Sequence, residues 1–150
     1  MAELNIVEKV LTLENVELFR NLKPEQLARI AAVASEISLG PNKDVYDPGK
    51  PPSALFVVIE GAVELSRESR WDPDRPAETE MLATARENEV LGAWALFDDE
   101  PLAIRARTLE DTRLMRISRD DFYDVLADNP EITQALFSTL VKRFRKLVEQ

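Results

Sequence analysis

The sequence contains no cysteine and no histidine, and it has only four glycines among its 150 residues. The absence of thiol and imidazole groups excludes disulfides, zinc sites with sulfur or nitrogen ligands, thiol nucleophiles and imidazole general bases. The acidic residues are scattered and do not show the spacing of a calcium-binding loop. We therefore expect a protein that is not an enzyme and that holds no metal ion.

Positive charge is also scarce, because 19 Lys and Arg face 28 Asp and Glu, which gives a net charge of −9. A surface of this sign repels phosphate backbones, so we expect no nucleic-acid partner. The exception is the basic run at residues 142–146, Lys-Arg-Phe-Arg-Lys. We interpret this run as a solvated helix end, where cations complement the carbonyl dipoles.

Long hydrophobic runs are missing too, since no stretch approaches the roughly 18 apolar residues that a membrane span needs. The N-terminus carries Glu3, Glu8 and Lys9 around a short apolar pair and lacks the core of a signal peptide. The sequence therefore predicts a cytoplasmic protein without membrane insertion.

The sequence predicts a single domain of the α+β class that covers residues 1–150 and has three parts. Residues 1–39 are predicted to form N-terminal helices, one of which opens at Pro24 and is stopped by Gly40. Residues 40–117 alternate short apolar runs with turn signals, which is typical of a β-sandwich or barrel. Residues 118–150 are predicted to form C-terminal helices, with Ser118 as an N-cap and a last helix to about Val148.

Within the middle part, eight short strands and one long loop are expected. Leu55–Ile59 is a compact apolar strand, and Val63–Leu65 returns from it. Residues 67–80 are polar and are predicted to be a long exposed hairpin loop. The last two strands are expected at 103–107 and 113–117. Further short strands are expected at Val45-Tyr46, Met81–Ala83, Val90-Leu91 and Ala95–Phe97.

The order and spacing of several short motifs resemble the cyclic-nucleotide-binding domain family, which includes the sensor domain of the bacterial catabolite activator protein. The resemblance covers about Ile6 to Leu147. The motifs are Leu18-Phe19, Leu22–Leu27, Leu55–Gly61, Leu91–Phe97, Asp98–Pro101, Leu109–Thr112, Phe122 and Asn129–Glu131. The resemblance implies an eight-stranded antiparallel β-roll, similar to a jelly roll, flanked by N-terminal and C-terminal helices.

The corners of such a roll favour residues that tolerate a left-handed backbone. Gly49, Gly61 and Gly92 stand at three of these corners. Asn42 and Asn88 stand at two others where the family prefers glycine, and asparagine is the next most tolerant residue. We therefore expect the roll to be intact.

The ligand chemistry that the resemblance implies is degenerate. In members that bind cyclic AMP or cyclic GMP, a Glu beside the Gly holds the ribose hydroxyl, and an Arg after a Pro pairs with the phosphate. Here Ala93 follows Gly92, Leu102 follows Pro101, and Ala103 stands where a phosphate-bonding hydroxyl sometimes occurs. The pocket candidates are Gly92, Ala93, Trp94, Leu102 and Ala103.

These losses are large on the scale of binding energies. An unpartnered buried charge costs about 2–5 kcal/mol, and a lost hydrogen bond to a charged group costs about 1.5–3 kcal/mol. Together they lower affinity by about three orders of magnitude. We therefore expect no cofactor, and a cyclic nucleotide is disfavoured as the ligand without being excluded.

Three nearby side chains leave alternatives open. Trp94 either fills the emptied pocket or is a core or lid residue without a ligand role. Arg105 and Arg107 are expected to face solvent or to pair with acidic residues, rather than to replace the missing phosphate partner.

The last helix carries an apolar seam of Phe137, Leu140, Phe144 and Leu147 at spacings of three, four and three. One hypothesis is a homodimer through this seam, as in coiled-coil packing. The alternative is a single broad face that packs on its own domain.

The sequence thus favours a regulatory, signal-transduction module that senses another ligand or works through protein contacts, including contacts with itself. A true cyclic-nucleotide sensor with a rearranged pocket is one alternative. Another is the sensor part of a transcription regulator without its DNA-binding domain, because such relatives carry a helix-turn-helix after the last helix and this sequence stops at Gln150. The N-terminal stretch resembles versions attached to larger bacterial regulators and membrane transport proteins. The ligand and the partner are not specified by the sequence.

Overall fold

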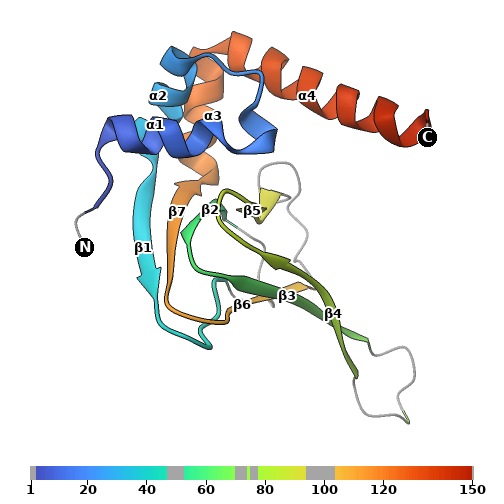
Figure 1. The fold of residues 1–150 in the computed structure, drawn as a ribbon. Helices are drawn as coiled ribbons and strands as arrows, with labels where there is room; N and C mark the ends of the chain where they lie inside the picture. The colour runs from blue at the N-terminus through green and yellow to red at the C-terminus, as the bar shows by residue number, and fades with distance from the viewer. Residues whose placement is uncertain (1–2, 47–52, 70–73, 75–77, 94–103, 150) are drawn as a thin grey trace.

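The computed structural model describes residues 3–46, 53–69, 74, 78–93 and 104–149. In these ranges the chain forms helices at both ends and antiparallel strands between them (Figure 1). The helices are α1 (Ile6–Glu14), the 3-10 helix η1 (Glu17–Phe19), α2 (Pro24–Val33), α3 (Arg119–Asp128) and α4 (Pro130–Val148). The strands are β1 (Ser35–Leu39), β2 (Ala54–Glu60), β3 (Val63–Ser69), β4 (Glu78–Ala85), β5 (Val90–Leu91), β6 (Ile104–Thr108) and β7 (Thr112–Ser118).

The strands form two sheets that together make the roll. One has the order β1-β7-β2-β5 and the other the order β4-β3-β6, and every pairing is antiparallel. The α+β fold and the antiparallel roll with flanking helices are therefore confirmed. Seven strands lie in the described residues, where the resemblance implied eight for the whole roll; the expected strand at 95–97 falls outside them.

The helix that opens at Pro24 ends earlier than the sequence suggested. The prediction of helices throughout residues 1–39 was wrong at its end, because α2 stops at Val33 and Ser35–Leu39 is a strand. This strand pairs along its whole length with β7, from Ser35 opposite Arg116 to Leu39 opposite Thr112. Those backbone hydrogen bonds to a distant strand override the local helical pattern.

Two expectations for the roll also change. The loop expected at 67–80 is shorter, because β3 continues to Ser69 and β4 begins at Glu78. Val45-Tyr46 is not a strand; the adjacent Asp44 makes only an isolated bridge to Arg107. The strands expected at 55–59, 63–65, 81–83, 90–91, 103–107 and 113–117 are confirmed over their described residues, with small changes of boundary.

Side chains of β2 alternate between two hydrophobic cores. Leu55 and Val57 point into a core that they share with the helices, where Phe19 and Phe122 lie with ring centroids 6.5 Å apart. Ala54, Phe56 and Val58 point into the interior of the roll. We refer to these as the helix-side core and the roll-side core.

The N-cap predicted at Ser118 is confirmed, and a second side-chain cap lies at the start of α1. Ser118 Oγ accepts a hydrogen bond of 3.1 Å from the backbone N–H of Asp121 at the start of α3. Asn5 and Glu8 form a reciprocal capping box at the start of α1.

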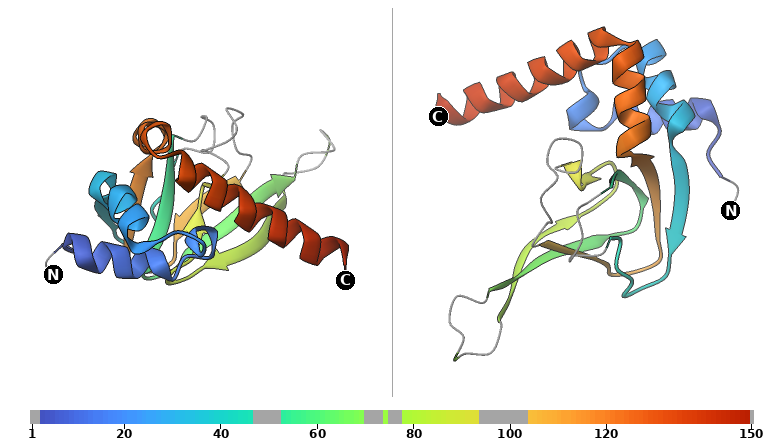
Figure 2. Two further views of the ribbon diagram at one scale, coloured as in Figure 1. Left: turned by 90° about the horizontal axis from the view of Figure 1, so that it is seen from above. Right: turned by 180° about the vertical axis from the view of Figure 1, so that it is seen from behind.

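The two termini lie at opposite sides of the molecule, because α4 runs away from the other helices toward its C-terminal end (Figure 2). Its first half is anchored by Ile132 and Leu136, which are buried in the helix-side core. The seam residues Phe137, Leu140, Phe144 and Leu147 are exposed by 68%, 41%, 66% and 72%. The alternative in which this seam packs on its own domain is therefore wrong.

Candidate functional site

The described part of the candidate pocket begins where β5 ends. β5 pairs with the first half of β2, with Leu91 opposite Phe56. Gly92 follows with a φ of +73°, and a Cβ there would lie 3.0 Å from the carbonyl oxygen of Ala54. Both the left-handed backbone and this close approach favour glycine.

The other predicted corners in the described residues also have a positive φ. Gly61 has a φ of +106°, and Asn42 and Asn88 have φ values of 60° and 72°. The left-handed backbone predicted at these positions is confirmed. Gly49 lies outside the described residues.

Ala93 is half-buried and packs against the helix-side core. Its methyl group therefore lies beside apolar side chains at the position where the family's binders carry a glutamate. The remaining predicted pocket residues, Trp94, Leu102 and Ala103, lie outside the described residues. The structure places Gly92 beside Ala54 at the start of β2, and the assignment of all five residues to a ligand pocket stays a prediction.

The roll interior next to Gly92 is apolar in the part of the chain that the structure describes. Its buried residues come from β2, β3, β4, β5, β6 and β7. They are Ala54, Phe56, Val58, Val63, Ala85, Leu91, Ala106 and Leu114. This interior is filled by packed apolar side chains, which cannot compensate the desolvation of a charged phosphodiester.

Tyr46 packs against this interior, and sequence reasoning missed that contact. Its ring stacks on Phe56, with centroids 6.4 Å apart and an interplanar angle of 29°. Burial raises the pKa of the Tyr46 phenol, so the hydroxyl is neutral at physiological pH. The only sequence signal was an apolar pair before Pro48, which was read as a strand.

Two buried threonine hydroxyls of the roll are engaged in its turns. Thr108 Oγ1 donates to the carbonyl oxygen of Gly40 at 2.6 Å and accepts from the backbone N–H of Lys43 at 2.9 Å. Thr112 Oγ1 donates to the carbonyl oxygen of Glu110 at 2.9 Å. Both side chains fix corners of the roll and are not available to a ligand.

Arg105 and Arg107 both pair with Asp44, which agrees with the expectation that they pair with acidic residues. Their Nε atoms lie 3.5 Å and 3.6 Å from Oδ1 of Asp44, and both side chains are 43% exposed. Ala106 between them points into the roll. Because side chains alternate along a strand, the two arginines lie on the opposite face of β6 from Ala106.

A second polar cluster joins the N-terminus to the first sheet. Arg113 Nη2 lies 3.0 Å from Oε2 of the buried Glu36, and the backbone N–H of Leu4 donates to Glu36 Oε1 at 2.6 Å. Burial alone raises the pKa of Glu36, but the Leu4 hydrogen bond and Arg113 together hold it below its usual value. No local sequence signal points to this cluster, because Glu36 and Arg113 are 77 residues apart.

Two further findings concern metal binding and membrane-spanning helices in the described residues. Among the described residues no group of three or more acidic side chains is arranged to hold a metal ion. Of the helices in those same ranges, none combines the length and the apolar character needed to cross a membrane.

The two antiparallel sheets, the left-handed corners and the flanking helices define the class of a β-roll domain. A profile described as "Cyclic nucleotide-binding domain" matches residues 36–129. The chain therefore belongs to the cyclic nucleotide-binding domain family.

The curated relatives include a transcriptional regulator and a protein kinase regulatory subunit. A "CRP-like cAMP-activated global transcriptional regulator" of Mycobacterium tuberculosis is 25% identical over 129 residues, which is 86% of this chain and 55% of that protein. A "cAMP-dependent protein kinase regulatory subunit" of Aspergillus fumigatus is 28% identical and covers 80% of this chain and 27% of that protein. This chain spans about half or less of the length of these curated relatives.

One solved structure agrees over nearly its full length. It is the N-terminal domain of a transcriptional regulator from Streptomyces coelicolor A3(2), which is 32% identical with a TM-score of 0.80. The alignment covers 92% of this chain and 93% of that one. All three of these similar proteins carry regulatory names.

Proposed function

We propose that this chain is a sensor or interaction module of the cyclic nucleotide-binding fold that does not bind cyclic AMP or cyclic GMP in the family's usual way. The observation that carries the proposal is Ala93, half-buried against apolar side chains where binders carry a glutamate. The apolar lining of the described roll interior supports it. A ligand of this roll is less anionic than a cyclic nucleotide.

Self-association is the second part of this proposal. The four seam residues of α4 are exposed, and Val141 and Val148 beside them are exposed by 41% and 66%. An apolar stripe of this kind on a helix that leaves its own domain fits a second copy of the same helix. The module would then work as a homodimer.

A genuine cyclic-nucleotide sensor is the second candidate function. It is favoured by the names of relatives that are cAMP-activated or cAMP-dependent. In that reading, backbone N–H groups after Gly92 hold the phosphate without the side-chain anchors. The transcription-regulator alternative is favoured by the Streptomyces coelicolor domain and concerns what the whole protein does.

Calorimetric titration with cyclic AMP and cyclic GMP separates these candidates. We expect the chain to bind both nucleotides more weakly than about 100 μM. The double variant A93E/L102R restores the two charged anchors of the family motif and is expected to bind cyclic AMP about two to three orders of magnitude more tightly.

The matched control is A93R/L102E, which adds the same two charges at exchanged positions and is expected to gain no affinity. Tight binding of cyclic AMP by the unmodified chain contradicts the proposal and supports the second candidate. Equal affinity of the double variant and its control contradicts the assignment of Ala93 and Leu102 as the lost anchors.

A further inference from the structure

A groove of about 330 Å³ lies between η1 with the turn after it and the C-terminal half of α4. It is separate from the roll interior. One wall carries Glu17, Arg20 and Asn21, and the other carries residues of α4 from Thr139 to Glu149. A hydrogen bond of 2.8 Å from Asn21 Nδ2 to Thr139 Oγ1 ties the two walls together.

The groove is basic although the chain as a whole is acidic. Five cationic side chains and two carboxylates line it. They are Arg20, Lys142, Arg143, Arg145 and Lys146, with Glu17 and Glu149. A net charge of −9 for the chain makes this local excess of positive charge exceptional.

Both carboxylates already have a cationic partner. Arg143 Nε lies 3.6 Å from Glu17 Oε1, and Arg145 Nη2 lies 3.5 Å from Glu149 Oε1. Among the described residues, no carboxylate lies within ion-pair distance of the other three cations, Arg20, Lys142 and Lys146. These three cations stand on both walls of the groove.

The two existing ion pairs do not block an incoming anion. Their side chains are more than half exposed, from 57% to 70%. Exposed pairs of this kind are held by little free energy, so a multiply charged anion can compete with either carboxylate. Arginine and lysine together suit phosphate oxygens, the first through its planar fork and the second as a point charge.

We propose that this groove binds a small polyphosphate anion, that is, a ligand that carries two or more linked phosphate groups. Linked phosphates concentrate several charges over a short length and can therefore meet cations on both walls at once. A small anion also experiences the local potential of the groove, whereas a nucleic-acid duplex approaches over distances at which the acidic surface repels it.

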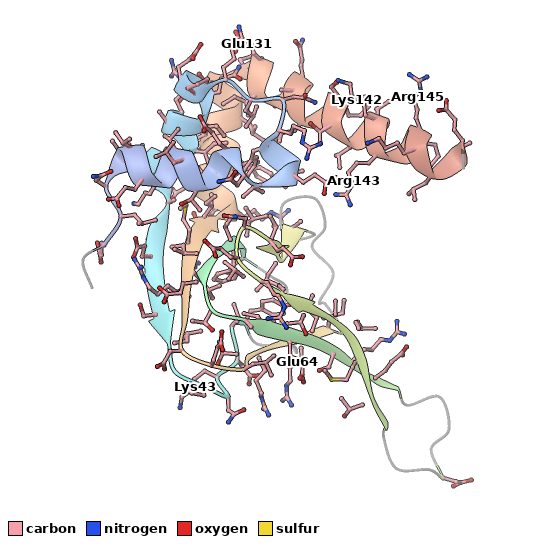
Figure 3. The ribbon with its side chains drawn as sticks, in the orientation of Figure 1. Lys43, Glu64, Glu131, Lys142, Arg143 and Arg145 are labelled. Atoms are coloured by element: carbon pink, nitrogen blue, oxygen red, sulfur yellow. The ribbon has the colours of Figure 1, made fainter. Side chains whose placement is uncertain are left out.

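The groove stays open when the seam of α4 is covered. Residues two apart on an α-helix differ by about 200° around its axis. Lys142 and Lys146 are each two residues from Phe144, so they lie on the face of α4 opposite to that seam residue. Figure 3 labels Lys142, Arg143 and Arg145 along the outer half of α4 and Lys43 at the far end of the molecule.

Calorimetric titration with inorganic tripolyphosphate tests the proposal. We expect saturable binding to the unmodified chain in the micromolar range, and at least about tenfold weaker binding for Lys142→Glu. The control is Lys43→Glu, which changes the net charge by the same amount at the opposite end of the molecule and is expected to change affinity less than about twofold. Sulfate at matched ionic strength and a short DNA duplex are titrated in parallel.

Equal weakening by the two charge reversals would show that only net charge matters and would overturn the site. Sulfate binding as tight as tripolyphosphate would overturn the requirement for linked phosphates. Tighter binding of the duplex than of tripolyphosphate would make the groove a nucleic-acid surface and would also overturn the proposal. Neither lysine belongs to the roll pocket, so these results are independent of the proposed function.

Discussion

At the scale of single residues, Gly61 turns the chain between β2 and β3 at a point where no side chain fits. An added Cβ would lie 2.6 Å from Thr112 Oγ1, 2.7 Å from the carbonyl oxygen of Asp111 and 2.8 Å from Thr112 Cα. Two of these atoms belong to backbone that is fixed at the start of β7. Gly40 differs, because its nearest neighbour would be Asp111 Oδ1 at 3.9 Å and its φ is not left-handed.

We expect Gly61→Ala to destabilise the fold by about 3 kcal/mol or more, through the strained φ and the overlap with β7. The control Gly40→Ala is expected to change stability by no more than about 1 kcal/mol. Urea denaturation followed by circular dichroism measures both. Equal stabilities of the two variants would refute this account of the corner.

These corners were predictable from the sequence because a left-handed residue is a local requirement that glycine and asparagine satisfy. Gly92 and Ala93 were likewise placed by a short motif. Tyr46 was not, because its stacking on Phe56 depends on how two separate segments meet. The sequence predicts backbone conformation at a corner better than it predicts which side chain enters the pocket.

At the scale of elements, α4 has two halves with different surroundings. Ile132 and Leu136 in the first half are 0% and 4% exposed, whereas Phe144 and Leu147 in the second half are 66% and 72% exposed. The helical periodicity that predicts the element is the same in both halves, so the sequence alone did not decide between a broad internal face and a seam. The packing of the first half decides it against the internal face.

We expect Phe144→Glu to abolish self-association, because a carboxylate in an apolar helix seam is desolvated without a partner. The same change in the exposed α1 residue Val7, which is 62% exposed, is the control and is expected to leave association unchanged. Sedimentation equilibrium measures both. A monomeric unmodified chain at high concentration would contradict the dimer.

The strand β1 illustrates the limit of prediction at this scale. Its residues alternate Ile37 and Leu39 with polar positions, but the stretch is short and follows a helical pattern directly. Its identity as a strand comes from pairing with β7, more than 70 residues later in the chain. A pairing between strands this far apart in the chain cannot be recognised from a short stretch of sequence.

At the scale of the whole molecule, the Glu36–Arg113 cluster joins the N-terminus, β1, β2 and β7. Arg113 also lies 3.6 Å from Glu60 at the end of β2. Lys9 of α1 donates to the carbonyl oxygen of Ala34 at 2.8 Å close by. The cluster therefore links the helical layer to the first sheet through charged groups rather than through apolar packing alone.

This cluster makes stability depend on pH in a defined direction. The pKa of Glu36 is lower in the folded chain than its ordinary value, so its contribution is present above the ordinary pKa. The contribution is lost as the pH falls through the lowered, folded-state pKa. We expect Glu36→Gln to cost about 2 kcal/mol near neutral pH and to flatten the loss of stability on acidification.

The control is Glu80→Gln, which breaks the exposed Arg67–Glu80 pair, where both side chains are about half exposed. This change is expected to cost less than about 0.5 kcal/mol. Denaturant midpoints measured from neutral to acidic pH test both variants. An acid profile of Glu36→Gln identical to that of the unmodified chain would rule out this role.

The alternation of β2 has a consequence for signalling. Val57 and Val58 are neighbours in the chain, yet one is packed among the helices and the other faces the roll. Under the proposed sensor function, a ligand that displaces the backbone of β2 from the roll side would also shift the side chains of β2 that pack against the helices. The two cores would then be coupled through the thickness of one strand.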